Sequence, residues 1–228
     1  MPSQAMRDAI VAIRDRQQAS AGQALPTLEE RRATFTPGDR LYPVPDDVLV
    51  TEVNAGGVPA HWLAAPGADT GRVLLFLHGG GLAVAMLVAT RDAGEPMPAA
   101  AVLMSPTVDL TSSGASMTER ADRDPISTPA MLRQFAADYL AGADPKTPLA
   151  SPLFAQLAGL PPLLVQVGTA DLLLSDSERL AAAAAAAGVD VTLEIGEGLP
   201  HVYQLMLGTP EAAEATERIG KFLRARVR

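Results

Sequence analysis

The sequence has 228 residues, of which 48% are hydrophobic and 19% are charged, a composition that excludes disorder and predicts one globular domain or one domain with a small cap. Lys and Arg number 18 against 26 Asp and Glu, so the net charge is -8, and no basic cluster precedes the C-terminal arginines. A nucleic-acid partner is therefore not expected. The sequence contains no cysteine, which excludes disulfides, thiolate catalysis and cysteine-ligated metal.

The N-terminal segment is expected to be helical. Residues 3 to about 35 carry apolar side chains at three- and four-residue spacing, and residues 26–30 mark a second helix start with acidic residues in its first turn. Because charged and apolar residues alternate from the start, no signal peptide is expected, and no apolar run approaches the ~20 residues of a membrane span. We expect a cytoplasmic protein with a helical cap over residues 1–45 and a core over 46–228.

The core begins with two β-rich runs, residues 47–54 and 58–65, whose connection Asn54-Ala55-Gly56-Gly57 predicts a hairpin. His61 lies beside Trp62 in the second run and is expected to pack. The continuous apolar run 72–77 is typical of a strand buried on both faces of a parallel sheet. Three later segments also predict strands, namely residues 101–104, 163–167 and 190–195.

Helices are predicted between and after these strands, over residues 82–91, 175–187 and 210–227, and a longer excursion at about 112–160 contains a helix at 129–140. Strands that alternate with helices predict an open α/β fold with a mostly parallel sheet and helices on both faces. The amphipathic end, residues 209–228, is interpreted as a surface helix, with packing in a homodimer as the alternative.

Two of the three histidines follow predicted strands, where sites form in open α/β sheets. His78 precedes Gly79, Gly80 and Gly81, and consecutive glycines let backbone N–H groups converge on an oxyanion, so a structural role is favoured for the histidine itself. His201 follows the last strand and is the only plausible general base.

Asp171 comes directly after the strand at 163–167 and can orient a histidine. Alone, it is equally well explained as a turn residue, with Asp176 stabilising the first turn of the next helix. The order of Asp171 and then His201, each after a late strand, is the order of acid and base in α/β-hydrolases. The pair is therefore expected to be functional.

Five segments together resemble the bacterial hormone-sensitive-lipase family of esterases: residues 72–81 (RVLLFLHGGG), 101–110 (AVLMSPTVDL), 124–140 (DPISTPAMLRQFAADYL), 163–176 (LLVQVGTADLLLSD) and 198–203 (GLPHVY). The resemblance implies an α/β-hydrolase fold, oxyanion donors at Gly79 and Gly80, a triad acid at Asp171 and a triad base at His201. It also implies an N-terminal helical cap over an acyl pocket, small-molecule ester substrates and no cofactor.

The chain departs from this family at its nucleophile. No Gly-x-Ser-x-Gly pattern occurs, and Gly81 continues directly into Leu82, the start of a segment similar to the helix that follows the family's serine. About 60 residues or more are missing at roughly 30 per strand–helix–strand step. Either the protein is internally shortened or the molecule contains residues beyond this sequence, and an intact mass several kilodaltons above 23.7 kDa would show the latter.

Ser105 is the one alternative nucleophile at a strand end, and it is disfavoured because the following Pro106 has no backbone N–H to offer an oxyanion. We therefore expect a carboxylesterase-type serine hydrolase by lineage, acting on small esters or lactones, whose present chain is inactive or severely impaired. The alternative is a non-catalytic pseudo-hydrolase that binds a ligand or partner. Neither needs a metal or cofactor.

Overall fold

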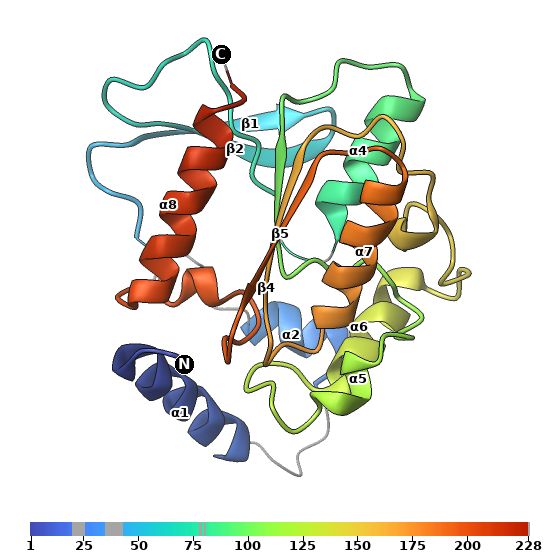
Figure 1. The fold of residues 1–228 in the computed structure, drawn as a ribbon. Coiled ribbons are helices and arrows are strands. Elements are labelled where there is room, and N and C mark those ends of the chain that lie inside the picture. Colours follow the sequence, from blue (N-terminus) through green and yellow to red (C-terminus); the bar gives the residue numbers. More distant parts are fainter. Residues whose placement is uncertain (20–25, 35–42, 78, 80, 228) are drawn as a thin grey trace. The chain divides into compact units, whose positions relative to one another are not determined.

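The computed structural model describes residues 1–19, 26–34, 43–77, 79 and 81–227 (Figure 1). Two compact units divide the chain: Met1–Gln23 together with Leu77–Arg228, and Ala24–Phe76. This division differs from the cap at 1–45 and the core at 46–228, which stay a prediction.

A parallel three-stranded sheet organises the larger unit. Its strands are β3 (Ala101–Met104), β4 (Leu163–Gly168) and β5 (Val191–Gly196), in the order β3-β4-β5. All six residues of β4 are buried, as expected for a central strand covered on both faces. The sequence-based predictions for these three strands are confirmed.

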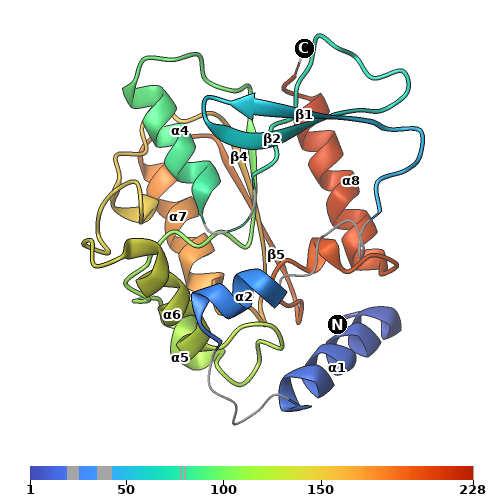
Figure 2. The ribbon, with the colours of Figure 1, turned by 180° about the vertical axis from the view of Figure 1, so that it is seen from behind.

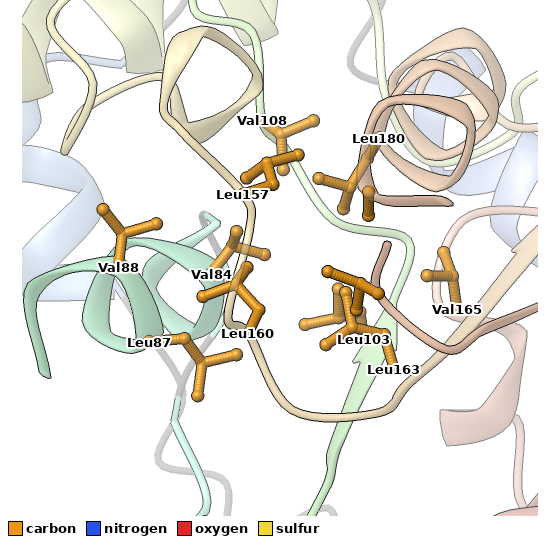
Figure 3. Close-up of a cluster of buried hydrophobic side chains, with 12 residues drawn as sticks. Val84, Leu87, Val88, Leu103, Val108, Leu157, Leu160, Leu163, Val165 and Leu180 are labelled. Atoms are coloured by element: carbon orange, nitrogen blue, oxygen red, sulfur yellow. The ribbon is translucent and has the colours of Figure 1, made fainter. Parts of the chain in front are cut away.

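Helices cover both faces of this sheet. Figures 1 and 2 show α4 (Leu82–Asp92) and α7 (Leu174–Ala186) on one side and α8 (Pro210–Arg224) on the other. The first side holds the main hydrophobic core, in which Val84, Leu87 and Val88 of α4 meet Leu103 and Leu163 of the sheet (Figure 3). Because these side chains are almost fully excluded from water, their burial is the main favourable contribution to this packing.

The excursion between β3 and β4 contains α5 (Ser116–Glu119), α6 (Pro129–Leu140) and the 3-10 turn η1 (Pro152–Phe154). The start of α6 is fixed by Thr128, whose hydroxyl accepts a hydrogen bond from the Met131 amide, and by Pro129, whose fixed φ suits a first helical position. The predicted helix at 129–140 is confirmed.

The first helix, α1 (Gln4–Ala19), belongs to the same unit as the sheet. Met6 is fully buried against Leu199, Tyr203 and Ala215, so α1 packs on α8 and on the 3-10 turn η2 (Tyr203–Leu205). No helix among the described residues is both long and apolar enough to span a bilayer.

The smaller unit contains α2 (Leu28–Thr34) and an antiparallel hairpin of β1 (Leu49–Ala55) and β2 (Val58–Ala64). Gly56 and Gly57, at φ 66° and 98°, make the predicted turn. Every residue of β1 is exposed, and an isolated two-stranded hairpin is at most marginally stable. His61 is exposed as well, so the expectation that it packs was wrong.

The prediction of a buried strand at residues 72–77 was also wrong. These residues have no strand assignment, and the side chains of Val73, Leu74, Leu75 and Phe76 are 63–73% exposed. A strand is stabilised by neighbours on its edges and by cover on its faces, and no described strand pairs with this segment.

Asp176, in the first turn of α7, ties this helix to the loop after β3. Its Oδ2 atom accepts hydrogen bonds from the amides of Val108 and Asp109, at 2.9 and 3.0 Å. Burial raises the pKa of Asp176 to about 6, the charge of Asp109 adds to the rise, and the two amides and Arg179 oppose it. The carboxylate thus stabilises the loop geometry at an electrostatic cost.

Substitution of Leu74 tests whether residues 72–77 form a buried strand, as the sequence predicts, or an exposed segment, as in the structure. We expect Leu74→Lys to change the free energy of unfolding by less than about 0.5 kcal/mol, because an exposed side chain loses no packing. The matched variant Leu164→Lys, in β4 where the side chain is 1% exposed, should cost several kcal/mol. Urea denaturation measures both, and equal losses would contradict the exposed placement.

Because the pKa of Asp176 is raised in the folded state, the free energy of unfolding should decrease as the pH rises. Below pH 3.8, the ordinary pKa of an aspartate, the Asp176 carboxyl is protonated in both the folded and the unfolded state. Between pH 3.8 and about 6 the carboxyl is ionised in the unfolded state and still protonated in the folded state, so folding becomes less favourable by about 3 kcal/mol as the pH rises through this range. Asp176→Asn keeps an acceptor for both amides and should remove this dependence. Urea denaturation from pH 4 to 7 tests it, with Glu178→Gln on the exposed side of α7 as control.

Candidate active site

Asp171 lies in the turn that follows β4. Its side chain is completely buried, and Oδ1 accepts a hydrogen bond from the Leu173 amide at 2.8 Å. The second oxygen, Oδ2, lies 3.2 Å from Nδ1 of His201, which follows β5. Because neighbouring parallel strands deliver their carboxyl ends to the same edge, β4 and β5 bring the two predicted residues together.

Glycine at position 168 permits this approach. A Cβ atom there would lie 1.8 Å from the carbonyl oxygen of Leu199, which only a residue without a side chain avoids. Two hydrogen bonds join the segments that follow β4 and β5. The Ala170 amide donates to the Leu199 carbonyl at 3.1 Å, and the Gly198 amide donates to Thr169 Oγ1 at 2.7 Å. The acid loop and the histidine loop are therefore joined at several points.

The surroundings favour the protonated imidazole of His201. Burial alone would lower its pKa, but the hydrogen bond to Asp171 and the negative charges of Asp171 and Asp124 outweigh burial and raise the pKa above its usual value. The side chain is 23% exposed. The imidazole is thus strengthened as a base and is still accessible from solvent.

Asp124 supports the acid loop and was not singled out from the sequence. Its Oδ2 accepts from the Leu172 amide at 3.0 Å, and its Oδ1 accepts from the amides of Ile126 and Ser127 at 2.8 and 3.0 Å. Burial raises the pKa of Asp124, and the three amides act against that rise. A signal was present in the sequence, because this aspartate opens the segment 124–140 that resembles the esterase family.

Ser105 supports the histidine loop. It follows β3 at φ 47° and its Oγ accepts a hydrogen bond from the amide of Val202, itself at φ 47°, at 3.0 Å. A left-handed conformation is unfavourable for a β-branched residue such as Val202, so the surrounding contacts must hold it. Ser105 therefore fixes the residue next to His201, a role that needs no nucleophilic oxygen.

The predicted glycine loop is described only in part. Gly79 lies at an exposed bend, Gly81 adopts φ 75° directly before α4, and His78 and Gly80 lie outside the described residues. A Cβ at Gly81 would lie 1.9 Å from the carbonyl oxygen of Thr107, two residues beyond Ser105. Glycine thus allows α4 to begin against the loop that follows β3.

The described residues contain no cluster of three or more histidine, aspartate or glutamate side chains suited to a metal. A cavity of about 460 Å³ lies between β5 and α8, lined partly by Glu194, Glu197, Glu211 and Arg218. Neither Asp171 nor His201 lines it, and its charged walls do not suit an uncharged acyl group.

Comparison with known proteins identifies the family of the chain. The family model described as alpha/beta hydrolase fold matches residues 50–205. An "Acetyl-hydrolase" of Streptomyces hygroscopicus is 48% identical over 167 residues, which cover 71% of this chain and 55% of that protein. An "Esterase" of Acinetobacter venetianus is 36% identical over 146 residues, covering 63% of this chain and 48% of that protein. The chain spans about half the length of these relatives.

Solved structures of esterases are similar to this chain over nearly its whole length. An esterase from the bacterial hormone-sensitive lipase family superimposes with a TM-score of 0.90 at 33% identity, with 100% of both chains covered. A mutant of the esterase E40 gives 0.90 at 34% identity, with 99% of this chain and 100% of that chain covered. The chain therefore belongs to the bacterial hormone-sensitive-lipase family of the α/β-hydrolase fold.

Proposed function

We propose that this protein descends from carboxylesterases acting on small uncharged esters or lactones, and that the present chain retains the acid and base of the site without its serine nucleophile. The observation that carries the proposal is the hydrogen bond between the buried Asp171 carboxylate and His201 Nδ1. In a catalytic triad, a carboxylate orients the histidine in this way, and the histidine then acts as the general base. The esterase and acetyl-hydrolase names of the relatives support the substrate class.

In this proposal each described residue has a distinct task. Asp171 holds the imidazole in the tautomer with its proton on Nδ1, so that Nε2 can accept a proton. Asp124 and Thr169 position the acid loop, and Ser105 positions the histidine loop. Backbone amides of the glycine loop at Gly79 and Gly80 would stabilise the oxyanion that forms when an ester carbonyl is attacked.

Ser105 does not replace the lost nucleophile in this proposal. Its Oγ already accepts the Val202 amide, the residue is 3% exposed, and Pro106 offers no N–H to an oxyanion. Without a serine nucleophile, ester hydrolysis should fall by several powers of ten relative to an intact relative.

A second candidate is a non-catalytic pseudo-hydrolase. The specific observation in its favour is the lack of any Gly-x-Ser-x-Gly pattern in the sequence. Such a protein would use the loops after β3, β4 and β5 to bind a small ligand without turning it over. The two candidates differ in whether hydrolysis depends on His201.

An ester assay distinguishes them. We expect hydrolysis of a short-chain p-nitrophenyl ester by the 228-residue chain to be slow but to fall about tenfold or more in His201→Ala, because the variant loses its general base. His61→Ala is the matched control, since that histidine is exposed on β2. Equal rates for the chain and for His201→Ala would remove the catalytic proposal and leave the binding protein.

The pKa of His201 tests the pair without any activity. In Asp171→Asn the hydrogen bond to a charged partner and the nearest negative charge are lost while burial remains, so the pKa should fall. Titration followed by NMR of the imidazole measures the change. Asp92→Asn, an exposed position in α4, serves as control, and an unchanged pKa in Asp171→Asn would show that the two side chains do not interact in solution.

A further inference from the structure

We propose that Nε2 of His201 is itself an acyl acceptor in this chain: the imidazole takes an acyl group from an activated ester and passes it to water. The inference rests on the proposed function in one respect, because both require an ester to reach His201. It differs in the covalent intermediate, which forms on a histidine nitrogen and not on a serine oxygen.

The geometry leaves one nitrogen of His201 available. Nδ1 faces the Asp171 carboxylate at 3.2 Å, which keeps the proton on Nδ1 and the lone pair on Nε2. Among the residues that the structure describes, none forms a hydrogen bond with Nε2. Since the side chain is 23% exposed, this lone pair can meet a small molecule from solvent.

The imidazole is also held in place. Its buried partner Asp171 is fixed by the Leu173 amide, and the adjacent Val202 is fixed by Ser105 Oγ at 3.0 Å. In an intact triad a serine hydroxyl lies at Nε2 and takes the acyl group first. Here the hydroxyl of Ser105 is directed at a backbone amide instead, so it does not occupy that place.

The reaction proceeds in two balanced steps. In the first, the Nε2 lone pair attacks the acyl carbon, a nitrogen–carbon bond forms, and the bond from that carbon to the leaving oxygen or sulfur breaks with its electron pair. The product is an acyl-imidazolium, whose positive charge the Asp171 carboxylate stabilises. In the second, water attacks the acyl carbon and gives one proton to solvent, the nitrogen–carbon bond breaks with its electron pair returning to Nε2, and the free carboxylic acid then ionises by releasing a second proton to solvent.

This chemistry selects its substrates. Because Nε2 attacks as a lone pair, it has no proton to give to the departing group, so the leaving group must be stable as an anion. Aryl esters and thioesters meet this requirement and simple alkyl esters do not. A His201 that instead activates water receives a proton it can return to the leaving group, which would allow alkyl esters to react.

Mass spectrometry of the chain treated with p-nitrophenyl trimethylacetate tests the proposal directly, because the hindered acyl group slows the attack of water. We expect a mass increase of one trimethylacetyl group, located on the peptide that contains His201 and removed by hydroxylamine. Release of p-nitrophenolate should exceed that of His201→Ala by about tenfold or more. His201→Gln is a second variant in case the alanine variant fails to fold.

Two controls separate the site from general reactivity. His61→Ala should keep the acyl group on His201, because His61 lies exposed on β2. Acylation of Lys146 or Lys221 would give amides that resist hydroxylamine, so these products are distinguishable. An acyl group found only on such lysines or on His61 would overturn the proposal.

The result also separates this inference from the proposed function. Hydrolysis that depends on His201 but leaves no acyl group on it, and that extends to alkyl esters, would overturn the acyl-imidazole and support base catalysis of water. No cleavage dependent on His201 would overturn both. Acylation of His201 with aryl esters alone would support the acyl-imidazole and would show that an ester reaches His201, the one premise that the two proposals share.

Discussion

The candidate site depends on the close approach of two backbone segments, at Gly168, the last residue of β4, and at Leu199 after β5. The distance is short enough that any side chain at position 168 would collide with a carbonyl oxygen, so glycine is a condition of the arrangement. Once these segments cross, ordinary amide hydrogen bonds worth about 1 kcal/mol each hold them together. The 3.2 Å contact between Asp171 and His201 is made where these two segments meet.

Buried carboxylates support the irregular backbone around the crossing. Asp124 and Asp176 each accept hydrogen bonds from amides of distant loops, at positions where those amides have no strand or helix to pair with. Burial opposes ionisation at both, which is why the pKa of each is raised. Asp109 differs because hydrogen bonds from Ser113, Thr111 and Arg179 outweigh burial and hold its pKa at about 2. The environment, not the residue type, thus decides the charge of each aspartate.

Local patterns in the sequence predicted most elements of this fold. The apolar runs at 101–104 and 163–167 and the helix at 129–140 were predicted from signals carried by neighbouring residues, and Asp171 and His201 were predicted because each follows a strand. The run at 72–77 has the same composition but is exposed, because burial depends on partner strands that a local pattern does not encode. Asp124 was missed as a support for a similar reason, since its partner Leu172 lies 48 residues away.

The placement of β3, β4 and β5 has a consequence for the order in which this site can form. The strands are neighbours in space and successive in sequence, and the connection from β4 to β5 is shorter than the one from β3 to β4, which favours early pairing of β4 with β5. The acid and the base both lie on the later part of the chain, within 30 residues of each other. The contact between the acid and the base is therefore encoded by β4, β5 and the turns that follow them, a short stretch of the polypeptide that brings the two side chains together by local pairing.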